Sequence, residues 1–339
     1  MGVQLREILV SHETSLEELK GKVIIIDAYN ILYQFLSSIR GPDGALFTDS
    51  KGRVTSHLIG LLSRNSRLIE EGIKPVYVFD GKVPELKLKV LQERKAVKIE
   101  AAKQYAEAVK DGDVESMRKF AARTVLLTKD MVAEAKMLLG YMGIPVIDAP
   151  SEGEAQAAFM VKHGDGFAVG SQDFDSLVDG APRLLQNLSI QGRRKKIGGG
   201  TVLIKPLIFD LQENLKHLGI NEDQLLALSM LIGTDYNPGG IKGIGPKKGL
   251  ALVREFKNDF EVLFNHVKWK DHCEDGWKDI WNVFRKMPVK KDYNLKWNAP
   301  DVKKIKEFLV KEREFSEDRI AKSLQSLAPK PQKGLGDYG

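Results

Sequence analysis

Seven acidic residues have the types and spacing that could do chemistry. Six of them follow short apolar runs directly or after a turn, and the seventh closes a helical pattern; they are Asp27, Asp80, Glu152, Glu154, Asp173, Asp175 and Asp235. Clustered carboxylates repel one another unless cations neutralise them. Hard cations take oxygen ligands, and Mg²⁺ needs only one or two direct carboxylates, so seven acids can hold two ions. The pattern therefore predicts two-metal hydrolysis of a phosphodiester.

These acids share a site only if the apolar runs are strands of one sheet. Runs rich in β-branched residues recur between longer helical patterns, at 23–26, 76–79, 145–147, 167–169 and 184–185. This alternation predicts an α/β fold with a mostly parallel sheet and helices on both faces. The carboxyl ends of parallel strands lie along one edge, where such proteins bind ligands, so we expect the acids to converge there.

Each acid also has a structural interpretation when it is considered alone. Asp27 can cap the helix that follows it. The segment Ser151-Glu152-Gly153-Glu154 fits a capping box, and Asp173 or Asp175 can likewise cap a helix. Four strand ends that all supply acids favour the metal site, but capping remains an alternative at each position.

Composition limits the class of protein. The chain has 339 residues, of which 42% are hydrophobic, enough for one large or two modest domains. Its net charge of +6 favours a polyanionic partner without requiring one. The single cysteine, Cys273, excludes an internal disulfide and a multi-cysteine zinc site. Without a signal-like start or a long apolar run, we expect an intracellular, cytoplasmic protein with no membrane segment.

A long helical insert separates the second and third predicted strands, from about Pro84 to Tyr141. Within 82–123 it carries eleven Lys or Arg against seven Asp or Glu, so it is locally positive. We interpret it as an arch over the sheet, with a solvated helical hairpin as the alternative. The glycine-rich basic stretch 192–200 is a hairpin tip or an ordinary loop, and from Glu222 to about Phe315 the pattern is helical.

Five sequence blocks resemble the flap endonucleases, members of the XPG-type structure-specific nuclease family, and most of all the archaeal form. The blocks are Ile26–Asn30, Lys74–Gly81, Ala149–Ala157, Ser171–Asp175, and Gly233–Tyr236 leading to Gly243–Gly245. They occur in family order, and every acidic position is filled. The resemblance implies a PIN-like nuclease core in which the seven acids bind two Mg²⁺ ions, with Mn²⁺ as a substitute.

The same resemblance gives roles to residues outside the acidic set. It implies that Lys87, Arg94 and Asp175 are catalytic, with the two cations on one helical face where they neutralise charge on the phosphate; otherwise they are ordinary helix charges. It also implies a helix-two-turn-helix that grips duplex backbone, although a plain connector is the alternative. The DNA-binding residues would be Tyr33, Arg40, Arg64, Gly240, Lys242, Gly243, Gly245, Lys247 and Lys248.

The implied organisation is one nuclease core over 1–325 and a flexible tail over 326–339. The core comprises an N-terminal nuclease region (1–98), a helical arch within about 82–130, an internal nuclease region (about 116–258) and the helix-two-turn-helix (about 223–256). In the tail, Gln332, Leu335 and Tyr338 fit a sliding-clamp-binding peptide. Gly339 replaces its last aromatic residue, so we expect weaker clamp binding.

The implied activity is cleavage of 5′ flaps at the single-strand/duplex junction, with 5′–3′ exonuclease activity, in DNA replication (Okazaki fragment maturation) and repair. The partner would be branched DNA (5′-flap, double-flap, nicked or gapped duplex), bound by a monomer. Two alternatives remain: a non-catalytic junction-binding protein and a PIN-type ribonuclease.

Overall fold

A seven-stranded mixed sheet forms the centre of the computed structural model, which describes residues 2–121, 124, 126–188, 193–195 and 201–327. Its strand order is β1-β9-β6-β5-β2-β3-β4. The strands are β1 (His12–Glu13), β2 (Val23–Asp27), β3 (Lys74–Phe79), β4 (Val146–Asp148), β5 (Ala168–Gly170), β6 (Arg183–Gln186) and β9 (Leu207–Asp210). The five strands β4, β3, β2, β5 and β6 are parallel, whereas β9 pairs antiparallel with β6 and β1. The predicted mostly parallel sheet is confirmed.

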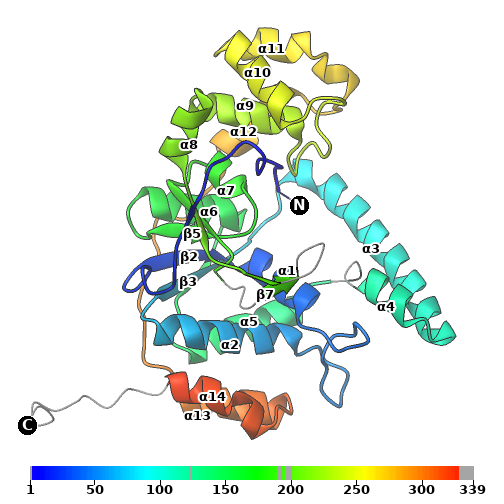
Figure 1. Ribbon diagram of the computed structural model, residues 1–339, viewed down its shortest axis with the longest axis vertical. Helices are drawn as coiled ribbons and strands as arrows, with labels where there is room; N and C mark the ends of the chain where they lie inside the picture. The colour runs from blue at the N-terminus through cyan, green and yellow to red at the C-terminus, as the bar shows by residue number, and fades with distance from the viewer. Residues whose placement is uncertain (1, 122–123, 125, 189–192, 196–200, 328–339) are drawn as a thin grey trace, which may run out of the picture.

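Helices cover both faces of the sheet (Figure 1). One face carries α1 (Ala28–Ser38), α2 (Ser56–Glu70) and α5 (Lys129–Tyr141), with α13 (Val302–Lys306), a π-helical turn (Glu307–Glu312) and α14 (Glu317–Leu327) packed outside them. The other face carries α6 (Gly153–Lys162). Strand residues such as Ile24, Ile25 and Val78 are wholly buried. The apolar runs lack period-two polarity because both of their faces are covered.

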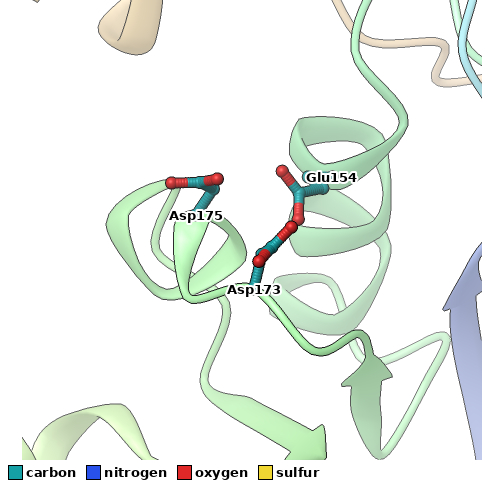
Figure 2. Close-up of side chains that lie close together, drawn as sticks. All are labelled: Glu154, Asp173 and Asp175. Carbon is teal, nitrogen blue, oxygen red and sulfur yellow. The ribbon is translucent and has the colours of Figure 1, made fainter. Parts of the chain in front are cut away.

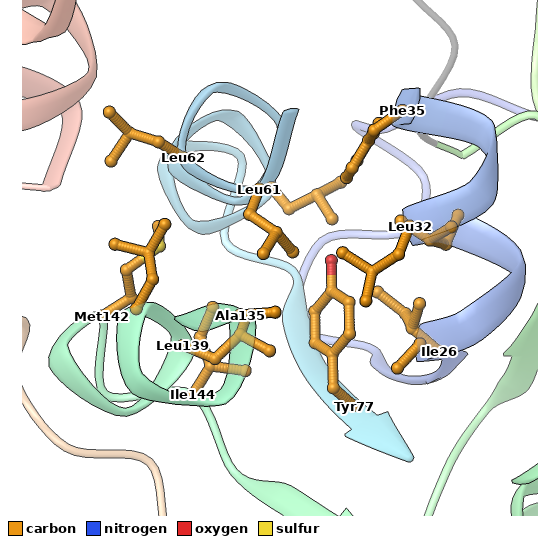
Figure 3. Packing of buried hydrophobic residues seen from close by; sticks show 14 of the residues in the cluster. Ile26, Leu32, Phe35, Leu61, Leu62, Tyr77, Ala135, Leu139, Met142 and Ile144 are labelled. Carbon is orange, nitrogen blue, oxygen red and sulfur yellow. The ribbon is translucent and has the colours of Figure 1, made fainter. Parts of the chain in front are cut away.

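The core under α1, α2 and α5 contains a buried pair of polar side chains, Tyr77 and Asn65. Figure 3 shows Tyr77 of β3 rising among Leu32, Leu61 and Leu139. Its hydroxyl exchanges hydrogen bonds with the side-chain amide of Asn65, at 3.0 and 3.1 Å. The packing fixes β3, and with it the strand end that leads to Asp80.

The insert after β3 has two parts rather than one. Helices α3 (Glu85–Asp111) and α4 (Val114–Ala121) form a hairpin that stands away from the sheet (Figure 1). Beyond it, α5 begins at a Thr128 cap whose Oγ1 accepts from the Met131 N–H at 3.2 Å. Ala135 and Leu138 of α5 are buried in the core. The helical pattern does continue to Tyr141, but its last helix, α5, belongs to the core and not to the arch.

The second half of the chain adds a helical group at one end of the sheet. It consists of α7 (Asp175–Val178), α8 (Leu211–Leu218), α9 (Glu222–Ile232), α10 (Pro246–Phe256), α11 (Phe260–His266), a 3₁₀ turn (Trp269–Asp271) and α12 (Trp277–Arg285). The basic stretch contains an antiparallel hairpin, β7 (Arg193–Lys195) with β8 (Thr201–Leu203), and residues 192 and 196–200 lie outside the described residues.

Residues 286–300, which we call the strap, form neither helix nor strand and interrupt the helical pattern expected from Glu222 to Phe315. The Lys290 backbone exchanges two hydrogen bonds with the Gln156 side chain on α6. Trp297 Nε1 donates to the Pro75 carbonyl at 3.0 Å, and the strap ends beside Gly143. It thus joins α12 to the C-terminal helices across one sheet face. No helix among the described residues is long and apolar enough to span a membrane.

Candidate active site

Two strand ends bring the first acids to the sheet edge. Asp27 is the last residue of β2, and its Oδ1 also accepts the backbone N–H of Asn30 at 3.2 Å, which caps α1. The capping interpretation is therefore correct for Asp27, and it coexists with a place in the site. Asp80 follows β3, and its Oδ1 accepts the N–H of Gly153 at 2.7 Å. A Cβ at position 153 would lie 2.7 Å from this oxygen, so any residue other than glycine would displace the Asp80 carboxylate.

The capping interpretation is wrong for the other acids. Glu152, not Ser151, occupies the N-cap position of α6, and it makes no side-chain capping bond. The Ser151 hydroxyl instead donates to the Lys82 carbonyl at 2.9 Å. Helix α7 begins after Phe174, again without a capping side chain, so neither Asp173 nor Asp175 caps it. These carboxylates are thereby left available to the site.

Three carboxylates from β5–α7 and α6 form a compact group. Figure 2 shows Glu154, Asp173 and Asp175 pointing toward one another. Each offers an oxygen, and these oxygens lie within 4.8 Å of one another. The hydroxyl of Ser171 donates to Glu154 Oε1 at 3.3 Å. Such a set of oxygen donors fits a hard divalent cation.

Neutral groups hold this carboxylate group in place. Asn30 Nδ2 donates to Asp173 Oδ2 at 3.0 Å, and Asn30 Oδ1 accepts the backbone N–H of Gln172. The Val3 N–H donates to Asp175 Oδ1 at 3.1 Å. Gly2 packs so closely that a Cβ there would lie 2.6 Å from Asp175 Oδ2. The sequence motif contained Asn30, but its role as a bridge between strand ends depends on the fold.

Burial and mutual repulsion shape the electrostatics of the site. Burial raises the pKa of Glu154 and Asp27 well above the ordinary range, and the charges of Asp175 and Asp80, respectively, add to it. Burial also raises the pKa of Asp80. For Asp175, burial and then the charges of Asp235 and Asp173 raise the pKa to about 7. Carboxylates crowded in this way call for cations.

Helix α3 supplies two cations to the site. Lys87 Nζ donates to Glu152 Oε1 and lies 3.0 Å from Asp235 Oδ2. Arg94 binds Asp235 with two nitrogens, at 3.3 and 2.6 Å. Burial alone would raise the pKa of Asp235, but the hydrogen bond from Arg94 and the charge of Lys87 lower it to about 2. All seven predicted acids and both predicted cations therefore meet at one edge of the sheet.

Tyr236 holds the other oxygen of Glu152. Its hydroxyl donates to Glu152 Oε2 at 2.6 Å, and its ring, only 4% exposed, lies 6.0 Å from Lys87 Nζ. The sequence carries a signal, since Tyr236 is adjacent to Asp235 in a matched block, but this adjacency alone does not reveal its role. The structure shows that it orients Glu152.

Tyr33, Arg40 and Arg64 lie outside the acidic group. Tyr33 on α1 is 36% exposed, and Lys98 Nζ stands 4.5 Å from its ring centre. Arg40 donates to the Gly44 carbonyl at 2.8 Å. Burial lowers the pKa of both arginines, which are half-buried near α1 and α2. Among the described residues, Arg40 Nε and Arg64 Nε have no acceptor.

The glycine-rich segment forms a tight turn between α9 and α10. Gly240 has a φ of 54°, and a Cβ there would lie 2.4 Å from the Leu231 carbonyl oxygen. Gly243 also has a positive φ, and Gly245 is the N-cap of α10. The lysines of the turn and of the first helical turn are all exposed: Lys242, Lys247 and Lys248. The candidate clamp residues Gln332, Leu335 and Tyr338 lie outside the described residues.

Comparison with known proteins decides the family. Residues 1–101 match the XPG N-terminal domain, and residues 143–235 match the XPG I-region. The chain is 50% identical over 331 residues to flap endonuclease 1 of Hyperthermus butylicus. This aligned region covers 96% of this chain and 94% of that protein. The chain belongs to the flap endonuclease 1 family. As a member of it, the protein is a nuclease that acts on phosphodiester bonds.

Solved structures agree with the flap endonuclease fold. The flap endonuclease-1 from Methanococcus jannaschii matches with a TM-score of 0.76 and 40% identity, over 96% of this chain and 98% of that one. The catalytic core of Rad2 in complex with a DNA substrate matches with a TM-score of 0.67 and 25% identity, over 94% and 96%. All seven acids lie within the two matched XPG regions, whereas residues 102–121 of the α3–α4 hairpin lie between them.

The pKa of Asp175 predicts how the stability of the metal-free flap endonuclease depends on pH. This pKa rises from about 3.9 in an unfolded chain to about 7 in the folded one. The folded state therefore binds more protons across this window, and the free energy of unfolding falls as pH rises. We expect a lower Tm at pH 8 than at pH 5.5 in EDTA, with Mg²⁺ restoring stability at pH 8. Asp175→Asn should reduce this difference; a Tm that is higher at pH 8 would contradict the assignment.

Tyr236→Phe tests the orientation of Glu152. The variant removes one hydrogen bond to a charged group, worth roughly 1.5–3 kcal/mol. We expect the single-turnover rate of DNA cleavage to fall about tenfold and the Tm to fall by a few degrees. Tyr293→Phe is the control, because its hydroxyl bonds Asp165 instead. Equal rates for the two variants would show that Tyr236 has no part in the site.

Proposed function

We propose that the protein is a structure-specific nuclease that cleaves 5′ flaps at the single-strand/duplex junction, with 5′–3′ exonuclease activity, in replication and repair. The observation that carries this proposal is the convergence of the seven acids at one sheet edge in a chain of the flap endonuclease 1 family. We infer that residues 1–325 act as one nuclease core.

The donor set supports two Mg²⁺ ions, with Mn²⁺ as a substitute. Glu154, Asp173 and Asp175 would hold one ion, because their oxygens already lie within 4.8 Å. The second would use acids on the other side of the site: Asp27, Asp80, Glu152 and Asp235. When bound, the ions supply Lewis-acid chemistry, in that they acidify water and neutralise charge on the phosphate.

The side chains on α3 would act on the phosphate itself. Lys87 and Arg94 carry permanent charge at the mouth of the acidic group, where charge develops during cleavage of the P–O bond. Asp175 would act within the metal-binding set, and Tyr236 would keep Glu152 in one orientation. The acids at the sheet edge would therefore bind the metal ions, and the cations of α3 would contact the phosphate.

DNA would be held by its backbone and shape. The Rad2 catalytic core has been solved with a DNA substrate, and its fold is shared by this chain. Exposed Lys242, Lys247 and Lys248 surround the N-terminus of α10, where main-chain N–H groups favour phosphate. Tyr33 would stack a base, at roughly 1–3 kcal/mol.

Two further contacts belong to this proposal. Arg40 and Arg64 match family positions near DNA, and we infer that they lie beside it; the guanidinium nitrogens that lack acceptors among the described residues are buried. In the tail, Gln332, Leu335 and Tyr338 would bind a sliding clamp weakly, since Gly339 removes one aromatic anchor. The protein would act as a monomer.

The deciding experiment is cleavage of a 5′-labelled double-flap DNA, with matched single-stranded and duplex DNA as controls, in Mg²⁺ or in EDTA. We expect a cut at the flap base that requires Mg²⁺. Binding without cutting would favour the junction-binding alternative, and preferential cutting of an RNA hairpin would favour the PIN-type ribonuclease.

A further inference from the structure

Five of the seven carboxylates of the site fall into two groups that differ in their partners, whereas Asp27 and Asp80 accept backbone N–H groups. Glu154, Asp173 and Asp175 receive hydrogen bonds from neutral donors, and within the described residues none of them forms an ion pair. Glu152 and Asp235, in contrast, are bound by the side-chain cations of α3. The difference is one of charge, because both groups lie at the same sheet edge.

The second group has every oxygen engaged. Glu152 Oε1 accepts from Lys87 and Oε2 accepts from Tyr236. Both oxygens of Asp235 accept from Arg94, and Oδ2 also lies 3.0 Å from Lys87. A divalent cation such as Mg²⁺ needs such oxygens at about 2.0–2.1 Å. Each of these oxygens keeps a second lone pair, but a divalent cation bound there would lie close to the ammonium and the guanidinium, and these like charges repel it.

We propose that the side-chain charges of Lys87 and Arg94 compete with a divalent cation for Glu152 and Asp235. Binding of the cation there would release the base of α3, residues 85–94, from these two carboxylates. The inference rests on the proposed function, which assigns these two carboxylates to a metal. It also gives the two ions an order. The first ion would bind at Glu154, Asp173 and Asp175 without displacing a side-chain cation. The second would bind only when Lys87 and Arg94 leave their carboxylate partners.

The competition is reciprocal. If a metal ion at Glu152 and Asp235 weakens the ion pairs between these acids and α3 by some factor, then breaking the ion pairs strengthens metal binding by the same factor. Lys87 and Arg94 would then be free to turn to a phosphate once the metal has replaced them. Helix α3 belongs to the hairpin that stands away from the sheet, so its base is the part that this exchange would move (Figure 1).

The test measures Mg²⁺ affinity of the full-length, DNA-free protein by isothermal titration calorimetry. Lys87→Met removes one competing charge, and we expect the weaker of two Mg²⁺ sites to tighten about tenfold. Lys89→Met is the matched control. It removes the same charge from the same helix, but Lys89 is exposed and pairs with Glu274 at 2.5 Å. We expect the control to stay within about twofold of the parent.

Arg94→Met gives an independent variant, since its half-exposed guanidinium pairs with Asp235 alone in the site. Amide hydrogen exchange supplies a second readout. In the parent protein, Mg²⁺ should accelerate exchange over 85–94, whereas in Lys87→Met exchange there should be fast with or without Mg²⁺.

Three results separate the possibilities. Unchanged Mg²⁺ affinity in Lys87→Met and Arg94→Met would overturn the inference. Equal tightening in Lys89→Met would also overturn it, because net charge alone would then explain the effect. A parent protein that binds no Mg²⁺ would instead overturn the proposed function, and the inference with it.

Discussion

Asp175→Asn should lower the single-turnover rate of flap cleavage by about 10³-fold or more, while flap binding stays within about threefold. Asp175 is buried and its carboxylate lies within 4.8 Å of Glu154 and Asp173. Asparagine keeps the shape and can still accept the Val3 N–H, but it removes one charged ligand. Several kcal/mol of metal-dependent stabilisation depend on such a ligand, which gives the expected factor. Single-turnover rates report the cleavage step directly, without product release.

A Tm measurement and a control variant distinguish a loss of catalysis from misfolding. Removing one charge from a crowded set relieves repulsion, so Asp175→Asn should raise the Tm of the metal-free protein at pH 8. Asp148→Asn is the matched control, since Asp148 ends β4 at the same sheet but pairs with Lys136 at 2.5 Å. A parent-like rate in Asp175→Asn would remove this residue from the site.

Lys87→Ala should slow single-turnover cleavage about 10²-fold and change flap affinity by less than about threefold. The ammonium stands between two acids of the site, where it can meet the phosphate but adds little to the grip on the duplex. The acids raise the pKa of Lys87 in spite of its burial, so the group stays charged throughout the neutral range. The rate loss should therefore be the same at pH 7 and pH 9.

Lys89→Ala again serves as the comparison for this variant. If Lys87→Ala weakened binding as much as it slowed cleavage, Lys87 would be a backbone contact rather than a catalytic group. An unchanged rate would make it an ordinary helix charge. In the inference above the same residue opposes metal binding, so cleavage should fall even though Mg²⁺ binds more tightly.

The sheet and its acidic edge could be predicted from sequence because two local signals coincide. The run Val23–Ile26 is apolar throughout, as a strand covered on both faces must be, and it ends in Asp27. The same holds for the run before Asp80. Strand bounds differed from the predicted ones by one or two residues, since the ends of strands carry weak signals.

The partners of the acids could not be predicted in this way. The predicted capping box does not form because the Ser151 hydroxyl donates to the Lys82 carbonyl, which lies 69 residues away in the sequence. Asn30 reaches Asp173 across 143 residues. Such contacts depend on strand order, which periodicity does not report. Burial of Ala135 and Leu138 likewise turned the end of the insert into a core helix, although its helical pattern looks continuous with the arch.

The strap left a signal that a helical interpretation overlooked. Tyr293, Leu295 and Trp297 alternate with polar residues, and Pro288 and Pro300 bound the segment. Period two between prolines is typical of extended chain. The three apolar side chains pack against the cluster under α6, as that alternation predicts.

The spread of the site along the chain also governs when it can exist during synthesis. Its carboxylates come from positions between Asp27 and Asp235, and the strap returns to Pro75 and Gly143 only after that. A ribosome therefore completes β2 and β3 long before the last acid emerges. Because the N-terminal domain of a chain folds first during synthesis, the early strands can form while the site still lacks Asp235. A chain truncated before this residue lacks one of the seven acids of the site.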